Sequence, residues 1–161
     1  MKKYLILILL ISSVFVKAQT FSDFDAKSID GKEIKFSETY KSGLTLVTFW
    51  ALWCEPCRTE IHIINKFYEK YHEKGLNVIS INQDTPRSIA KVRSYVVSHD
   101  LNFPVIPDLK KELFQHFNGQ SIPLTFLIDK SGNVVYKHIG YLPGDETELE
   151  GEIVKHLGAG N

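Results

Sequence analysis

Apolar and polar positions along the chain switch repeatedly between the pattern of a strand and the pattern of a helix. Three short apolar runs, at residues 44–50, 76–81 and 124–128, predict strands buried on both faces, because they are rich in β-branched residues and too short for a core helix. Apolar residues recur at spacings of three and four within residues 54–74 and 86–99, which predicts two longer helices. Shorter helices are expected over residues 109–117 and 145–157.

Turn signals divide the rest of the chain into hairpins and short extended pieces. Residues 21–29 and 33–36 flank Asp30-Gly31, a strong hairpin signal, so they predict an N-terminal β-hairpin whose first strand lies at an edge. Ser37 is expected to cap a short helical turn, and Pro104 and Pro107 bracket a short extended piece. Residues 133–139 are expected to pair back onto residues 124–128. The pattern predicts one α/β domain over residues 19–161, with a central mixed sheet flanked by helices.

The first 18 residues have the pattern of a targeting segment. A basic start, Met1-Lys2-Lys3, precedes the uncharged residues 4–16, and Ala18 is a fair match to a cleavage position. The apolar run is shorter than the roughly 20 residues of a spanning helix. We therefore predict a cleaved signal peptide over residues 1–18, with an uncleaved membrane anchor as the alternative because Lys17 is unusual so close to a cleavage point. Export would place the protein in an oxidising compartment, in a periplasmic location.

Composition narrows the possible functions. Lys plus Arg and Asp plus Glu both number 19, so the formal net charge is zero, which argues against a nucleic-acid-binding protein. Only two cysteines are present, which excludes a disulfide-dense scaffold and a four-cysteine zinc ribbon.

Both cysteines lie in Trp53-Cys54-Glu55-Pro56-Cys57, directly after a predicted strand and at the start of a predicted helix. A structural disulfide is a weak explanation, since closing so short a loop stabilises little. Covalent haem attachment needs a histidine after the second cysteine, where Arg58 stands. No metal site is predicted, because no second cysteine pair exists and the histidines are scattered along the sequence, at His62, His72, His99, His116, His138 and His156.

Redox chemistry is the strongest interpretation of this motif. Unpaired N–H groups at a helix start stabilise negative charge, so the pKa of Cys54 is expected to fall below that of a free thiol. Cys57, further into the helix, is expected to be more buried and to resolve a mixed disulfide formed at Cys54. Pro56 restrains the turn at a position that tolerates a missing N–H. The Glu55 carboxylate opposes thiolate formation and so favours a reductant.

The stretch from Thr48 to Glu60 resembles the active site of the thioredoxin superfamily, in particular its TlpA/ResA/DsbE-like exported thiol–disulfide oxidoreductases. A second similar stretch runs from Ser121 to Asp129. The resemblance implies a thioredoxin fold with an extra strand-helix insertion, a cis bond before Pro123, and a client chain that pairs with the backbone of Ile122. It also implies no cofactor besides the Cys54–Cys57 disulfide, disulfide-containing exported proteins as clients, apocytochrome c among them, and a membrane thiol electron donor.

Three positions deserve separate interpretation. Thioredoxin carries a buried Asp on the active-site strand where this chain has Thr48, so Glu60, three residues after Cys57, is the candidate acid/base; the alternative is a glutamate that only favours the helix dipole. Trp53 is expected to shield the disulfide and help to dock a client, or else simply to pack. Leu52 either adds an apolar contact for a partner or is a neutral replacement.

The sequence therefore predicts an exported enzyme in which Cys54 attacks a client disulfide and Cys57 resolves it. One alternative is a thioredoxin-fold peroxidase, which would need a threonine upstream of its reactive cysteine where Leu52-Trp53 stands. The other is a non-enzymatic copper carrier, which would need a wider cysteine spacing and a histidine ligand. The client, the direction of electron flow and the oligomeric state are not encoded in any residue that we can name.

Overall fold

The computed structural model describes residues 19–158, and the predicted signal peptide or anchor at residues 1–18 lies outside them. The elements, in chain order, are β1 (Asp25–Lys27), β2 (Glu33–Lys35), α1 (Phe36–Ser42), β3 (Leu44–Trp50), α2 (Glu55–Tyr71), η1 (His72–Lys74), β4 (Leu76–Asn82), η2 (Pro86–Ser88), α3 (Ile89–Ser98), β5 (Val105–Pro107), α4 (Glu112–His116), β6 (Leu124–Ile128), β7 (Val134–Ile139) and α5 (Asp145–Gly158).

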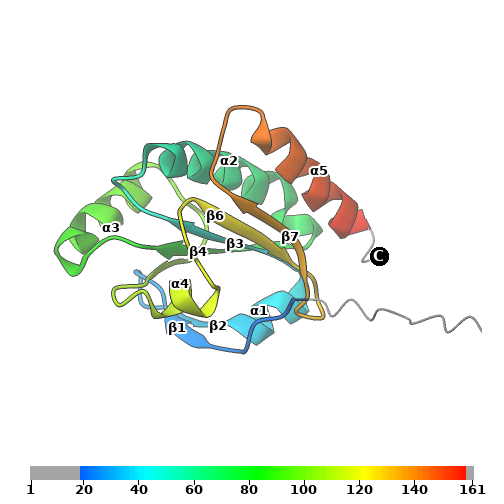
Figure 1. Cartoon of the computed structure of the whole chain (residues 1–161), viewed down its shortest axis with the longest axis horizontal. Helices are drawn as coiled ribbons and strands as arrows, with labels where there is room; N and C mark the ends of the chain where they lie inside the picture. The colour runs from blue at the N-terminus through cyan, green and yellow to red at the C-terminus, as the bar shows by residue number, and fades with distance from the viewer. Residues whose placement is uncertain (1–18, 159–161) are drawn as a thin grey trace, which may run out of the picture.

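A five-stranded mixed sheet forms the centre of the domain, in the order β5-β4-β3-β6-β7. The strands β5, β4 and β3 run parallel, whereas β6 and β7 run antiparallel to their neighbours. Helices α2 and α5 cover one face, and α1, α4 and the small β1–β2 sheet cover the other (Figure 1). This architecture confirms the predicted mixed α/β fold, in which every residue of β3 and of β6 is buried because helices cover both faces.

Two apolar clusters hold the layers together. The cluster under α2 includes Trp50, Ile61, Ile64 and Ile153, all fully buried. The cluster on the opposite face is rich in aromatic rings, with Phe36 and Phe117 at a centroid distance of 5.8 Å. The active-site strand β3 contributes side chains to both clusters, so its carboxyl end is held rigidly from two sides.

The N-terminal region departs from the prediction in detail. The edge strand expected over residues 21–29 is reduced to β1, because the ring of Phe21 leaves the strand path and packs 4.2 Å from that of Phe117. Phe36 begins α1 instead of ending β2, and Ser37 does not cap the helix: its N–H and hydroxyl both donate to Asp23. The hairpin itself is confirmed, with Gly31 at a φ of +90° in the turn.

The insertion between α3 and β6 consists of β5 and α4, as expected. Its helix is shorter than the predicted 109–117, because the Asp108 carboxylate accepts the N–H groups of Leu113 and Phe114 and fixes the helix start near Glu112. Within residues 19–158, no helix is long and apolar enough to cross a membrane.

Candidate active site

The two cysteines occupy the junction between β3 and α2. Cys54 is the N-cap residue of α2, and Cys57 lies in its first turn, joined to Cys54 by a disulfide with Cα atoms 5.2 Å apart. Cys54 is 5% exposed and Cys57 is fully buried, in the order expected from the helix position. Because the first N–H groups of a helix lack partners within it, a thiolate formed at Cys54 on reduction would lie where negative charge is stabilised.

In the loop before Cys54, side chains from two other segments bond to the backbone of Leu52. The Leu52 N–H donates to Asp84 Oδ2 at 2.7 Å, and the Arg58 guanidinium donates to the Leu52 carbonyl. Asp84 is itself buried and accepts a second bond, from the Asn82 amide at 2.9 Å. Sequence reasoning missed Asp84 and Arg58. The available signal for Asp84 was its place just after β4, since the carboxyl ends of parallel strands meet at one edge of a sheet.

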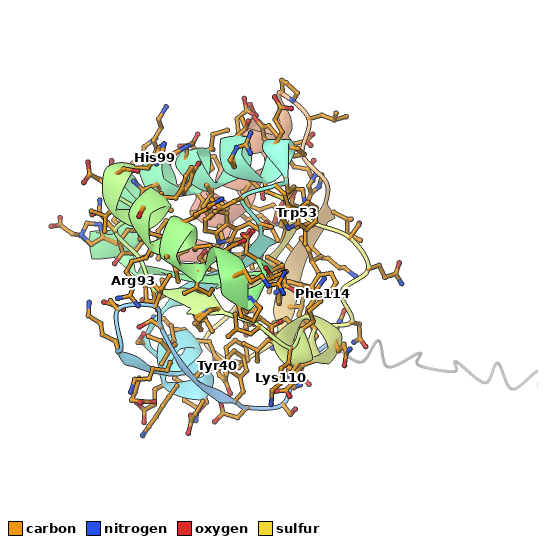
Figure 2. All side chains as sticks on the ribbon, turned by 90° about the vertical axis from the view of Figure 1, so that its left-hand side faces the viewer. Tyr40, Trp53, Arg93, His99, Lys110 and Phe114 are labelled. Carbon is orange, nitrogen blue, oxygen red and sulfur yellow. A yellow bond between two sulfur atoms is a disulfide. The ribbon has the colours of Figure 1, made fainter. Side chains whose placement is uncertain are left out.

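The surface around the disulfide is partly apolar. Trp53 is 65% exposed, and Figure 2 shows it near one end of α3, with His99 at the other end. Pro56 is exposed, whereas Pro123 is buried and its bond to Ile122 is cis, as the resemblance implied. Ile122 is half-buried and packs against the apolar cluster that contains both cysteines. The structure therefore places an exposed aromatic side chain directly beside the reactive pair.

Glu60 lies one turn beyond Cys57 on α2 and is only 4% exposed. Burial raises the pKa of Glu60 to about 7. A hydrogen bond from the Thr125 hydroxyl, at 3.2 Å, acts in the opposite direction, because it favours the charged form of the carboxyl. The Thr125 hydroxyl also lies 3.1 Å from that of Thr48, its partner across the β3–β6 pair. Glu60 is therefore no helix-surface residue, and a carboxyl that titrates near neutral pH can take up or release a proton.

A second set of titratable side chains lies beside Glu60 at the β7 edge. His138 Nε2 is 3.1 Å from Asp145 Oδ2, and both side chains are about one quarter exposed, at 27% and 29%. Tyr136 and Tyr141 line the same small cavity as Glu60. No sequence pattern indicated this cluster, because its members come from separate elements.

The fold brings two histidines together that are far apart in the sequence. The rings of His62 and His99 lie 4.9 Å apart, and Tyr95 contacts both: its ring stacks on His99 at 4.0 Å, and its hydroxyl lies 2.9 Å from His62 Nε2. Their distance along the sequence gave no indication of this contact. Burial lowers the pKa of His62, and His99 and Lys66 lower it further. Among residues 19–158, no group of three or more His, Cys, Asp or Glu side chains is arranged to hold a metal ion.

The site and the fold define a class of protein. The disulfide joins two cysteines separated by two residues, and it lies at the start of the helix that follows the central strand of a thioredoxin-type sheet. This arrangement is the redox-active site of a thiol–disulfide oxidoreductase.

Comparisons with known proteins agree with this class. The chain is 35% identical over 133 residues to the thiol-disulfide oxidoreductase ResA of Bacillus cereus (strain ZK / E33L). The aligned residues cover 83% of this chain and 74% of the relative. It is 32% identical to the thioredoxin-like protein YneN of Bacillus subtilis (strain 168), over 82% of this chain and 76% of the relative. A thiol:disulfide interchange protein of the thioredoxin family from Chlorobium tepidum TLS has the same fold, with a TM-score of 0.76 and 24% identity over 88% of this chain and 97% of that one.

The model of the AhpC/TSA family matches residues 18–137. The chain belongs to this family, and within it to the ResA-like thiol–disulfide oxidoreductases. The resemblance seen in the two sequence stretches is thereby confirmed.

Proposed function

We propose that this oxidoreductase works as an exported reductase of disulfides in exported proteins, for which apocytochrome c is one candidate client. The observation that supports this most directly is the pairing of Cys54, which is 5% exposed and follows exposed Trp53, with a fully buried Cys57 one turn from the buried carboxyl of Glu60. The N-terminal pattern of residues 1–18 supports export.

In the proposed reaction the enzyme begins as a dithiol. The Cys54 thiolate attacks one sulfur of the client disulfide, so that a mixed disulfide forms and the first client sulfur leaves as a thiolate that takes a proton. Trp53 and Pro56 would contact the client, and the backbone of Ile122 would pair with its chain.

The second step needs a base, because Cys57 is buried as a thiol. The Glu60 carboxylate would take the Cys57 proton, and the Cys57 thiolate would attack the Cys54 sulfur and expel the second client sulfur. The client gains two electrons and two protons, and the enzyme ends as the disulfide that the structure describes. A membrane thiol electron donor would then reduce the enzyme again, with no further cofactor.

The reduction potential of the Cys54–Cys57 couple tests the proposed direction. The chain from residue 19 onward would be equilibrated with glutathione or dithiothreitol buffers and followed by tryptophan fluorescence, for which Trp53 beside Cys54 is a suitable reporter. A value near or below about −230 mV supports a reductase, whereas a value near about −120 mV, the range of strong oxidants, reverses the direction.

The resolving step can be tested separately with the small disulfide 5,5′-dithiobis(2-nitrobenzoate). Attack by Cys54 releases the first thionitrobenzoate, and attack by Cys57 on the mixed disulfide releases the second. Glu60→Gln is expected to slow the second release at pH 7.5 by about 100-fold, the lower range of general base catalysis, and to leave the first within twofold. Equal second rates in the variant and the wild type would remove Glu60 from the mechanism.

A further inference from the structure

A row of polar side chains crosses the sheet from its centre to its β7 edge. The strand register sets Thr48 on β3 opposite Thr125 on β6, and Thr125 opposite His138 on β7. All three therefore share one face of the sheet, since cross-strand partners point the same way. Glu60 on α2 contacts Thr125, so this is the face that α2 and α5 cover (Figure 1). Burial of polar groups in a core is costly unless they are bonded, so the row needs a physical explanation.

The row leads from a buried group to a group in contact with solvent. Glu60 is only 4% exposed. The His138 side chain is 27% exposed, and its partner Asp145 is 29% exposed. A proton held by Glu60 can therefore reach the solvent at the β7 edge if the space between Glu60 and His138 can carry it.

That space is a small cavity lined by Glu60, Tyr136, His138, Tyr141, Asp145 and Leu149, among others. The cavity leaves a volume of about 10 Å³ for the centre of a water molecule, which is close to the volume needed to hold one water. Within residues 19–158, the buried hydroxyl of Tyr136 has no hydrogen-bond partner. Its ring is parallel to that of His138, with an interplanar angle of 2° and centroids 6.2 Å apart. Tyr136, whose hydroxyl can both accept and donate a hydrogen bond, thus lines the same cavity as His138.

We propose that Glu60 exchanges its proton with solvent across this cavity, through the Tyr136 hydroxyl or one water, to the imidazole of His138 at the outer end of the row. The inference rests on the proposed function, in which Glu60 takes up the proton of Cys57. The carboxylic acid of Glu60 gives up the proton and returns to a carboxylate, while His138 becomes an imidazolium and then releases the proton to solvent. Because Nε2 lies against Asp145, Nδ1 is the atom left to accept the proton.

The surrounding charges suit this direction of transfer. The N–H of Leu142 lowers the pKa of Asp145, and the bond to His138 lowers it further, so Asp145 is a carboxylate at neutral pH and stabilises the imidazolium. Burial, followed by the nearby Glu148 and Asp145, raises the pKa of Tyr136 to about 12. Burial and the bond to Glu146 raise the pKa of Tyr141 to about 12 as well. Both phenols therefore keep their protons, and Tyr136 can pass one on only by accepting another.

The test follows the protonation of Glu60 in the oxidised full-length chain. A laser-triggered pH jump would be followed by time-resolved infrared absorption of the protonated Glu60 carboxyl, assigned as the band that Glu60→Gln abolishes. His138→Ala is expected to slow the appearance of this band at least about tenfold, and imidazole in the buffer is expected to restore the wild-type rate. A merely structural role of His138 would not respond to imidazole.

Two further variants complete the experiment. Asp145→Asn keeps the imidazole but removes the charge that stabilises its protonated form, so it should slow exchange less than His138→Ala does. His72→Ala removes an exposed imidazole at the far end of α2 and should exchange like the wild type. Wild-type exchange in folded His138→Ala, or slowing that imidazole does not reverse, would overturn the proposed route.

The oxidised protein has no free thiol, so a failure of this route is separate from a failure of the proposed function. If His138→Ala exchanges normally while Glu60→Gln still slows the second thionitrobenzoate release, only the route is wrong. If Glu60→Gln leaves that release unchanged, the proposed proton acceptor is wrong whatever the infrared result.

Discussion

The pKa of Glu60 makes a quantitative prediction about stability. Glu60 has an ordinary pKa of 4.5 and a pKa of about 7 in the folded protein. The folded state therefore binds this proton more tightly than the unfolded state does. The resulting stabilisation is fully present below pH 4.5 and is lost as the pH rises through 7. At about 1.4 kcal/mol per pKa unit, the shift corresponds to about 3 kcal/mol, and no large reduction for solvent screening applies because the side chain is only 4% exposed.

The substitution Glu60→Gln removes this titration and keeps the shape of the side chain. The variant resembles the protonated wild type, so the two proteins are expected to have similar unfolding free energies at pH 5. At pH 8 the variant is expected to be more stable than the wild type, and the difference between them should grow by about 2 to 3 kcal/mol from pH 5 to pH 8. Carboxylates elsewhere in the chain are common to both proteins and cancel.

Urea unfolding of the oxidised proteins, in half-unit steps of pH, measures this difference directly. Glu55→Gln is the matched control for the loss of a carboxylate from α2, because Glu55 lies in the first turn of the same helix but is exposed. If the difference between Glu60→Gln and the wild type stays flat within about 0.5 kcal/mol, Glu60 does not titrate near neutral pH and the burial argument is wrong.

Three further variants test other parts of the site. Thr125→Val removes the bond that favours the charged form of Glu60. The pH at which proteins with and without Glu60→Gln come to differ in unfolding free energy should therefore move upward in this background, and an unchanged or lower pH in the same urea series contradicts this. Asp84→Ala leaves the Leu52 N–H and the Asn82 amide without their acceptor and should cost about 2 to 4 kcal/mol of unfolding free energy. Asp25→Ala, at an exposed aspartate, is the control, and a loss below about 1 kcal/mol in Asp84→Ala would show that the loop is held by other contacts. Trp53→Ala should lower kcat/KM for reduction of insulin disulfides about tenfold, because an exposed aromatic side chain beside Cys54 is available to a protein client. The rate with 5,5′-dithiobis(2-nitrobenzoate) should stay within twofold, and equal losses with both substrates would contradict a docking role.

The main elements were predictable because each depends on a local pattern. The strand over residues 124–128 has the bounds that its apolar run indicated, since burial on both faces leaves no exposed position within β6. The helix predicted over residues 54–74 is present as α2, which ends at Tyr71 and continues as the short η1 to Lys74. The errors lie where a tertiary contact competes with a local signal. Phe21 and Phe24 join an aromatic cluster instead of extending β1, and Asp23 takes the bonds of Ser37 that would have capped α1.

The chemistry of the site was predictable only in part, for a related reason. Cys54, Cys57 and Glu60 lie at the N-cap and in the first two turns of α2, so their spacing in the sequence indicates that they are close in space. Asp84, Thr125 and His138 reach the site only through the sheet, because strand order and register decide which residues stand opposite one another. No pattern within a single segment carries that information.

The same register explains how a threonine can stand on β3 at the position of thioredoxin's buried Asp. Thr48 keeps a hydroxyl at that position, and this hydroxyl contacts Thr125, which in turn donates to the Glu60 carboxyl from α2. In this chain the buried carboxyl comes from the helix above the sheet, and the hydroxyls of Thr48 and Thr125 make the polar contact between sheet and helix. A carboxyl on α2 lies closer to the β7 edge than one on β3, because β6 separates β3 from β7. Its proton therefore has a short path to the His138–Asp145 pair, which a carboxyl on the central strand would not have.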